Sequence, residues 1–347
     1  MTISRKDTVL IILSTLLLVV VSGVFYFDLN KPRTVDVLPQ TVVKEEIKND
    51  PHPLSGKRCE NSTTRPFAVM LAEDTSTRPL SGIAKADLVV EMPVVKDSIT
   101  RIMALYACEE PEAIGSVRSA RDDFIPLAAG FDAIYAHWGG SSFALKELNK
   151  DILDNLDALI NPNNVFYRKS GILAPDNGFT SYARLLETSI FLDYRLKTDF
   201  EGYPDLEESS PEIDTPSTIF ISYPKPFDVS YIYSKDKNEY LRWRGSKPEI
   251  DALDGSQVSA KVLVIMKTST RQINADYNDV DVTGEGDAVI FQNGGMQKVK
   301  WEKSVDSIYS KLKFLDAKGN EVPLVAGNKW IHIIDTYTPV LWGDNNV

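Results

Sequence analysis

The sequence predicts an α/β domain followed by a β-rich domain, behind one N-terminal transmembrane helix. Three observations lead to this prediction. An uncharged apolar run occupies residues 9–27. Strand-like apolar runs then alternate with helical segments up to residue 200, a pattern typical of α/β domains. Beyond residue 217, short strand-like runs follow one another with Gly and Asn turns between them, which indicates a β-rich domain.

The apolar run reads VLIILSTLLLVVVSGVFYF. As a helix it would measure roughly 28 Å, close to the hydrocarbon thickness of a bilayer. Arg5 and Lys6 precede it, and basic residues remain on the cytoplasmic side, so we expect residues 1–8 to be a cytoplasmic stub and the rest to lie outside. The rival interpretation, a cleaved signal peptide, requires a shorter apolar core and a small-residue cleavage site, whereas this run ends in bulky aromatic residues.

The composition and net charge of the chain argue against some classes of binding partner. The chain has 347 residues, of which 43% are hydrophobic, enough for two domains after the anchor. The net charge of −11 argues against a nucleic-acid partner, which selects for basic faces, and against an anionic membrane surface.

Two segments have the composition of connectors. Residues 28–58 contain four prolines and little periodicity, and we expect them to be a tether between the anchor and the folded part. Residues 201–216 contain three prolines and an acidic cluster, which predicts a linker. The α/β domain would then span 59–200 and the β-rich domain 217–340.

Periodicity places the individual elements. In the α/β domain we expect strands at 67–71, 86–91, 99–107 and 131–137, and helices at 119–129, 142–149 and 181–196. In the β-rich domain we expect strands at 217–222, 229–234, 239–244, 261–266, 279–283, 288–292, 296–301, 311–315 and 329–334.

The chain has two cysteines, Cys59 and Cys108. In an oxidising compartment they can form a structural disulfide that fixes the lead-in to the domain. The alternative is two unpaired thiols. Neither residue lies in a Cys–His setting typical of a thiol nucleophile.

The densest group of polar residues is the segment 115–121, GSVRSAR. A Gly-containing turn that leads into a helix N-terminus suits an anion, because backbone N–H groups and the helix dipole face it. Arginine adds a bidentate grip on carboxylate or phosphate. Arg101, Arg118, Ser119 and Arg121 are therefore the candidate ligand-binding residues. The alternatives are that Ser119 is only an N-cap and that the arginines form structural ion pairs.

Two further side chains lie at the ends of expected strands, Glu91 and His137. If those strands are parallel, both side chains reach the edge of the sheet where ligands bind in open α/β folds. They are the candidate catalytic acid and base. The alternative is that His137 only bonds a neighbouring loop.

No metal and no cofactor are expected. The three histidines are scattered, and neither zinc-binding nor phosphate-binding motifs occur. The acidic segment 276–281 lacks the calcium-loop pattern of an EF-hand and is interpreted as a solvated turn.

The order of several short motifs resembles the YerB-like proteins, a bacterial family built from the N- and C-terminal parts of a domain of unknown function numbered 3048. The motifs are PLSG (53–56), RPFAVM (65–70), RPLSG (78–82), ADLVVE (86–91), ITR (99–101), PEAIG (111–115), VRSAR (117–121), FDAIY (131–135), His137, GGS (139–141), YLR (240–242), Trp301 and GNKWI (327–331). The resemblance implies an extracytoplasmic, membrane-attached protein, often a lipoprotein, and implies no established activity.

This chain departs from the family pattern in two places. The Cys of a lipoprotein signal is absent from the end of the apolar run. Asp176-Asn177 stands where the family tends to have His-Asn, which puts an enzymatic role of that position in doubt.

These observations predict a membrane-anchored cell-envelope protein that binds an anionic ligand such as a cell-wall glycan. One alternative is a cell-wall polymer hydrolase that uses Glu91 and His137. Another is a non-enzymatic scaffold that recruits an envelope protein through its β-rich domain.

Overall fold

The computed structural model describes residues 50–96, 98–209, 217–343 and 345–346. The expected membrane helix at 9–27, the stub before it and most of the tether lie outside the described residues. Among the helices that the structure does describe, none has the length and apolarity needed to cross a membrane.

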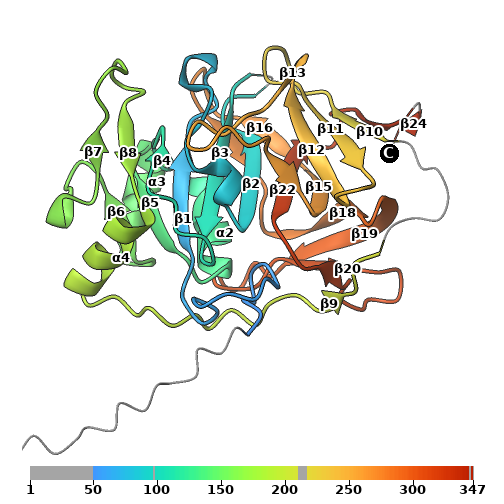
Figure 1. The fold of residues 1–347 in the computed structure, drawn as a ribbon, viewed down its shortest axis with the longest axis horizontal. Coiled ribbons are helices and arrows are strands. Elements are labelled where there is room, and N and C mark those ends of the chain that lie inside the picture. The colour runs from blue at the N-terminus through green and yellow to red at the C-terminus, as the bar shows by residue number, and fades with distance from the viewer. Residues whose placement is uncertain (1–49, 97, 210–216, 344, 347) are drawn as a thin grey trace, which may run out of the picture. The chain divides into compact units, whose positions relative to one another are not determined.

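The largest element is a ten-stranded mixed sheet, coloured from blue to red in Figure 1. In sheet order its strands are β20 (Lys313–Leu315), β19 (Gly295–Lys303), β18 (Gly284–Gln292), β15 (Val262–Thr268), β22 (Lys329–Asp335), β2 (Leu88–Pro93), β3 (Thr100–Tyr106), β1 (Phe67–Leu71), β5 (Ile134–His137) and β6 (Asn155–Asp157).

Strands from both halves of the sequence meet in this sheet. Ile331 of β22 is the register partner of Val264 in β15 and of Val90 in β2, in parallel on both sides. The expected division into an α/β domain and a separate β-rich domain is therefore not found, because half of the sheet comes from each.

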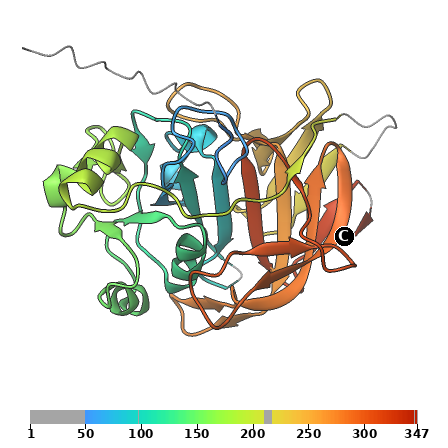
Figure 2. The same cartoon turned by 90° about the horizontal axis from the view of Figure 1, so that it is seen from below.

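Side chains alternate between the two faces of the sheet and form two cores. One face packs against α2 (Ile125–Gly130) and α3 (Ser142–Leu148), with Phe124, Leu127 and Leu148 buried there. The connector after α4, which contains Phe200, runs below the strands toward β9 (Figures 1 and 2). We call the face of the large sheet that packs against α2 and α3 the helix face.

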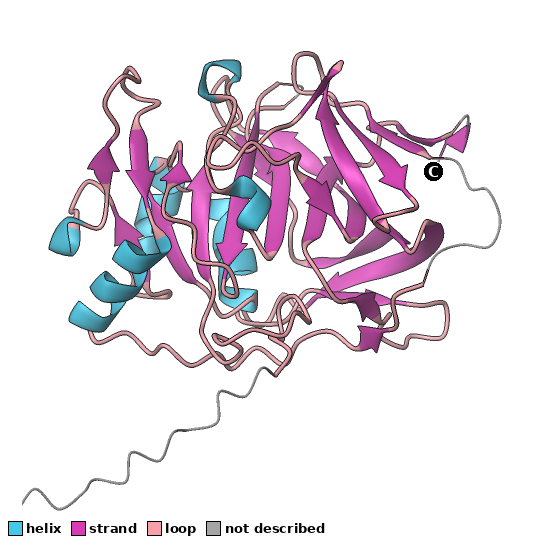
Figure 3. Ribbon diagram, viewed as in Figure 1, coloured by secondary structure: helices cyan, strands magenta, loops and turns pink. Residues whose placement is uncertain are grey.

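The other side, which we call the second-sheet face, is covered mainly by strands (Figure 3). Tyr231, Tyr240 and Ile221 pack there with Trp330 of the large sheet. The covering sheet contains β13 (Lys247–Pro248), β12 (Glu239–Arg244), β11 (Val229–Ser234), β10 (Thr218–Ile221), β23 (Val340–Trp342) and β24 (Asn345–Asn346), with β14 (Ser259–Ala260) paired to β12.

Smaller elements complete the fold. A three-stranded sheet and α4 (Tyr182–Phe191) add Ile114, Tyr182 and Leu185 to the second-sheet core. The remaining strands are β4 (Ile114–Gly115), β8 (Gly178–Thr180), β7 (Tyr167–Arg168), β9 (Asp205–Leu206), β21 (Leu324–Val325), β16 (Thr270–Gln272) and β17 (Asn278–Val280).

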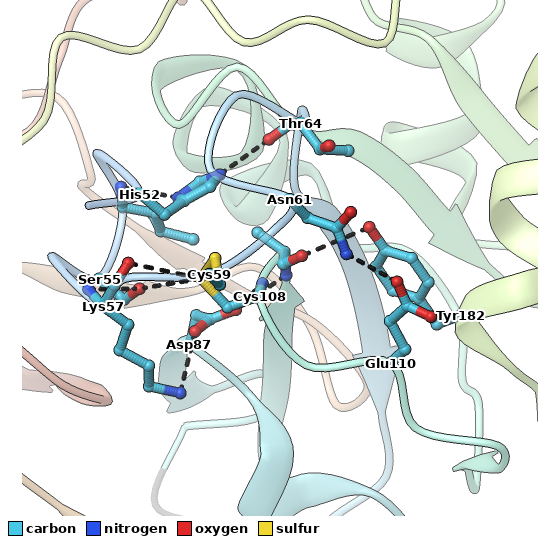
Figure 4. Close-up of a disulfide and its surroundings, with 12 residues drawn as sticks. His52, Ser55, Lys57, Cys59, Asn61, Thr64, Asp87, Cys108, Glu110 and Tyr182 are labelled. Atoms are coloured by element: carbon cyan, nitrogen blue, oxygen red, sulfur yellow. Dashed lines mark hydrogen bonds and ion pairs between the residues drawn. A yellow bond between two sulfur atoms is a disulfide. The ribbon is translucent and has the colours of Figure 1, made fainter. Parts of the chain in front are cut away.

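A disulfide joins Cys59 to Cys108, the residue pair that the sequence offered as a candidate (Figure 4). Beside it, Lys57 forms an ion pair of 3.1 Å with Asp87, whose carboxylate also accepts from the Cys108 N–H. Residues 50–58 were expected to belong to the tether. They instead pack on the domain, since Leu54 is buried in the helix-face core.

Candidate functional site

The candidate ligand-binding residues gather where β1 and β5 end. These two strands are parallel, so their carboxyl ends lie at one edge of the sheet. The segment 116–121 crosses this edge between them. The Arg118 N–H donates to Met70 at 2.8 Å, and the Arg118 carbonyl accepts from Trp138 at 2.9 Å. Arg118, Ser119 and Arg121 are thereby held at the edge that the sequence predicted.

Arg101 reaches the same edge from β3. Because β3 is antiparallel to β1, it begins where β1 ends, and Arg101 stands one residue before Ile102, the partner of Leu71. Alternation along β3 places Arg101 on the helix face together with Met103. The four candidate residues thus come from two separate segments of the chain.

Arg101 is the unusual member of this group. Its side chain is only 7% exposed. Nevertheless, no described residue forms a hydrogen bond or an ion pair with its guanidinium, and its Nε is buried without a partner. Burial, helped by the positive charges of Arg121 and Arg118, lowers the pKa of Arg101 to about 10, against the attraction of Asp74 and Glu73. The structure therefore holds an unpaired buried cation beside two other cations.

The other two arginines have internal partners. Arg118 Nη2 donates to Asp176 at 2.5 Å and to Asp74 at 3.2 Å. Arg121 donates to the Ala120 carbonyl at 3.0 Å, and its guanidinium lies 5.5 Å from the centre of the Tyr277 ring. The structural ion-pair interpretation thus applies to Arg118, with Asp176 and Asp74 as its partners.

Ser119 does not open a helix, which corrects the expected helix at 119–129. A 3-10 helix begins only at Asp122, and α2 follows at Ile125. The reason is that Ala120 forms a β-bridge with Gly140, which keeps the chain extended up to Arg121. No described residue makes a hydrogen bond with the Ser119 hydroxyl, and the nearby Ser116 hydroxyl is buried without a partner.

Glu91 is part of a fully buried ionic network. Its carboxylate accepts from Arg242 at 2.6 Å, from Arg244 at 3.1 Å and from the Thr100 hydroxyl at 2.8 Å. Burial raises the pKa of Glu91, but Arg242 and Arg244 lower it by more, so the pKa lies well below its usual range. A carboxylate that is ionised, buried and fully bonded is not available as a general acid.

His137 is buried as well and bonds its own surroundings. Its Nδ1 donates to the Gly139 carbonyl at 2.8 Å, and its Nε2 lies 3.3 Å from the Asn155 side-chain oxygen. Burial lowers the pKa of His137. This is the neighbouring-loop alternative that the sequence left open.

The structure does not bring Glu91 and His137 together. Glu91 shares the second-sheet face with Thr100 and His332, whereas His137 shares the helix face with Tyr135. Strands β3 and β1 also stand between β2 and β5, which at ~4.8 Å per strand separates the two residues by roughly 14 Å. The expected acid and base therefore do not form a catalytic pair.

Most of the network around Glu91 could not be predicted from the sequence. Five charged residues from both halves of the chain meet there, and all are buried: Glu73, Glu91, Arg242, Arg244 and Glu249. Arg242 also donates to Glu249 at 2.7 Å and to the Tyr231 hydroxyl at 2.5 Å. That hydroxyl lies 2.8 Å from His332 Nε2.

The order of buried and partly exposed side chains in β12 explains why this network could not be predicted from the sequence. The strand reads EYLRWR, and its buried residues are Tyr240, Arg242 and Arg244, while Leu241 and Trp243 are partly exposed. Hydrophobicity alone predicts the opposite orientation of the strand. The only signal in the sequence is that both arginines share a face with Tyr240.

Within the described residues, no group of three or more His, Cys, Asp or Glu side chains is arranged to hold a metal ion. In the acidic segment 276–281, Asp279 pairs with Arg271, and Asp281 accepts from Ser269.

Comparison with known proteins gives the family. The sequence model of the N-terminal domain of the proteins of unknown function DUF3048 matches residues 54–194, and that of the C-terminal domain matches residues 219–331. The chain belongs to the DUF3048 family. Arg101, Arg118 and Arg121 lie in the first matched region, and Arg242 and Arg244 in the second.

Both the sequence and the fold of this chain are similar to those of YerB. YerB of Bacillus subtilis (strain 168), a predicted lipoprotein by its name, is 29% identical over 320 residues, which is 89% of this chain and 92% of YerB. The crystal structure of Bacillus subtilis YerB superimposes with a TM-score of 0.74 at 28% identity and covers 83% of this chain and 98% of that one.

The DUF3048 regions and the fold divide the chain differently. The two matched regions are separated at residues 195–218. In space, however, β2 from the first region pairs directly with β22, which begins in the second. The N- and C-terminal parts of the family are therefore regions of the sequence and not separate structural domains, since both contribute strands to one sheet.

Proposed function

We propose that this chain is a membrane-anchored protein of the cell envelope that binds an anionic ligand outside the cytoplasm through Arg101, Arg118, Ser119 and Arg121. The observation that carries the proposal is the unpaired, buried Arg101 guanidinium. The ligand class is a molecule that presents a carboxylate or a phosphate, such as an anionic cell-wall glycan.

The location has three supports. The apolar run at 9–27 follows Arg5 and Lys6, and the relative YerB is named as a predicted lipoprotein. The disulfide between Cys59 and Cys108 agrees with an oxidising compartment. In this proposal, a transmembrane helix attaches this chain to the membrane, as a lipid attaches a lipoprotein.

The anion preference follows from the cost of burying a charge. An ion taken out of water costs several kcal/mol unless a counter-charge and hydrogen bonds replace its hydration. Arg101 has no hydrogen bond or ion pair among the described residues, and the repulsion of Arg121 and Arg118 opposes the longer-range attraction of Asp74 and Glu73. A bound carboxylate or phosphate would supply both, since its oxygens accept from guanidinium donors.

The proposal is tested with the full-length chain in lipid nanodiscs and purified bacterial cell wall. Arg101→Met keeps the apolar stem and removes the charge, so binding should fall at least about tenfold, the loss of one charge-assisted contact of roughly 1.5–3 kcal/mol. Lys300→Met is the control, because Lys300 is 65% exposed on β19 and forms only a surface pair with Asp287. Equal binding by the Arg101→Met variant would overturn the proposal.

Two small anions identify the recognised group. Titration with inorganic phosphate and with acetate should show saturable binding of at least one of them to the wild-type chain, weakened in Arg101→Met. If neither anion competes with the cell wall, the arginines do not recognise its charged groups.

A further inference from the structure

A second feature lies away from the arginines, beside α2 and the connector after α4. Two adjoining cavities of about 560 and 230 Å³ share Ala129, Asp132, Arg195 and Tyr309 as lining residues. The larger one lies within the range of roughly 300–1,000 Å³ that is usual for small-molecule sites. None of the four candidate ligand-binding residues lines either cavity.

Tyr309 is an exposed aromatic side chain that is nevertheless held in place. It stands on the loop between β19 and β20 with 60% of its surface exposed. Its hydroxyl donates to the Ile152 carbonyl at 2.6 Å, on the far side of the smaller cavity. The ring is thus fixed where both cavities meet, so a ligand ring could stack on it with little loss of side-chain entropy.

A buried lysine fixes the loop that carries Tyr309. The Lys303 side chain is fully buried, and its Nζ donates to the Ile308 carbonyl at 2.8 Å and to the Ser310 hydroxyl at 3.2 Å. Burial lowers the pKa of Lys303 to about 8. The Lys303 ammonium group thus holds the loop in its conformation through these hydrogen bonds.

The opposite wall is also preformed. The Asp132 carboxylate accepts from Arg195 Nη1 at 3.0 Å and from the Asp199 backbone N–H at 2.7 Å. These bonds hold the connector against the end of α2. Both walls of the cleft are therefore set before a ligand arrives, as is usual for binding sites.

The charges of the cleft select against polyanions. Four carboxylates line the larger cavity, against three cations: Asp132, Asp199, Glu201 and Glu302, and Arg195, Lys311 and Lys313. The Arg195–Asp132 pair neutralises both of its members, and Lys311 pairs with Glu321 at 2.5 Å, so Asp199, Glu201 and Glu302 remain against Lys313. Additional negative charge on a ligand would therefore be repelled.

We propose that this cleft binds an uncharged oligosaccharide, with the Tyr309 ring as the stacking platform. A sugar ring presents an apolar C–H face, which suits an aromatic ring, and a rim of hydroxyl groups, which carboxylates and serine hydroxyls can bond. The cleft supplies both kinds of group, and its two cavities on either side of Tyr309 suit a chain of more than one sugar. This proposal does not rest on the arginine site.

The test titrates the full-length chain in lipid nanodiscs with chitotetraose and cellotetraose by calorimetry. The wild-type chain should bind at least one of them, and Tyr309→Ala should weaken that binding at least about tenfold, equivalent to about 1.4 kcal/mol. Tyr309→Phe keeps the ring but loses the hydrogen bond that fixes it to Ile152, so its affinity should lie between those of wild type and Tyr309→Ala. Tyr337→Ala is the matched control, because Tyr337 is 91% exposed and lines neither cavity.

The outcomes separate this proposal from the arginine site. Arg101→Met should bind the tetrasaccharide with unchanged affinity. The oligosaccharide proposal fails if neither tetrasaccharide binds at millimolar concentration, or if Tyr309→Ala binds as tightly as wild type while its thermal unfolding is unchanged. It fails also if polygalacturonate, a polyanionic sugar, binds the cleft more tightly than the uncharged chains.

Discussion

Glu91 and Arg242 form an ion pair of 2.6 Å in which both side chains are fully buried. Glu91 belongs to β2 of the ten-stranded sheet and Arg242 to β12 of the second sheet, so the pair joins the two layers. Its two residues come from opposite halves of the sequence.

Removing one partner of this pair should destabilise the protein strongly. Arg242→Met leaves the Glu91 carboxylate buried with one cation fewer, and we expect the free energy of unfolding to fall by about 3–5 kcal/mol. Guanidinium denaturation of the variant measures this. Glu91→Gln in the same chain should restore part of the loss, because it removes the uncompensated charge.

The surface pair Lys300–Asp287, also 2.6 Å long, is the control for that experiment. Both of its side chains are mostly exposed, and Lys300→Met should leave the denaturation midpoint unchanged. If Arg242→Met is as mild as this control, the buried network does not contribute to stability as described.

The network should also produce a pH dependence. Burial lowers the pKa of His332 from 6.5 to about 3, against the attraction of Glu91. Between these values the unfolded chain binds a proton that the folded chain does not, so stability should fall as the pH falls through this window. Denaturation midpoints at several pH values should show a shallower slope for His332→Gln than for wild type over the same window. Equal slopes would show that His332 is not the group responsible.

Arg101→Met should have opposite effects on binding and on stability. Because Arg101 is buried without a partner, replacing it by an apolar side chain should raise the free energy of unfolding by about 1 kcal/mol or more. Thermal unfolding measures this. Phosphate at about 100 times the wild-type Kd should stabilise the wild-type chain by about 2.7 kcal/mol, and the variant, whose affinity is at least about tenfold lower, by about 1.4 kcal/mol or less. A destabilised variant would mean that Arg101 has a structural partner.

The disulfide should stabilise the lead-in and the domain together. Cys59 and Cys108 are 49 residues apart, and closing a loop of that length is worth about 4 kcal/mol in the chain-entropy estimate. We expect reduction, or the double variant Cys59→Ser and Cys108→Ser, to lower Tm. Unchanged melting in the presence of a reductant would contradict this expectation.

Local pattern predicted many elements of this fold but few of its long-range pairings. The strand expected at 329–334 is β22, at Lys329–Asp335. Nothing in its sequence indicated β2 as a neighbour, since strand partners are chosen by tertiary packing. The same limit explains the two expected domains, which were divided at a proline-rich linker.

The candidate site too could be predicted from the sequence only in part. Strand ends can be inferred from periodicity, and the structure places Arg101, Arg118, Ser119 and Arg121 near the edge where β1 and β5 end. The face on which a side chain lies cannot be inferred when both faces are buried, and Glu91 and His137 consequently lie on opposite sides. The arginines of β12 were missed because charged residues are expected outside.

The position of β22 has a consequence for biogenesis. During synthesis, β2 emerges early, and the strand that pairs with its free edge is among the last to leave the ribosome. Until then the chain exposes an apolar strand edge of the kind that promotes aggregation. Maturation of this protein therefore depends on keeping its first half from associating until its last strands have been made, and a chain that stops before residue 329 would lack the centre of its sheet.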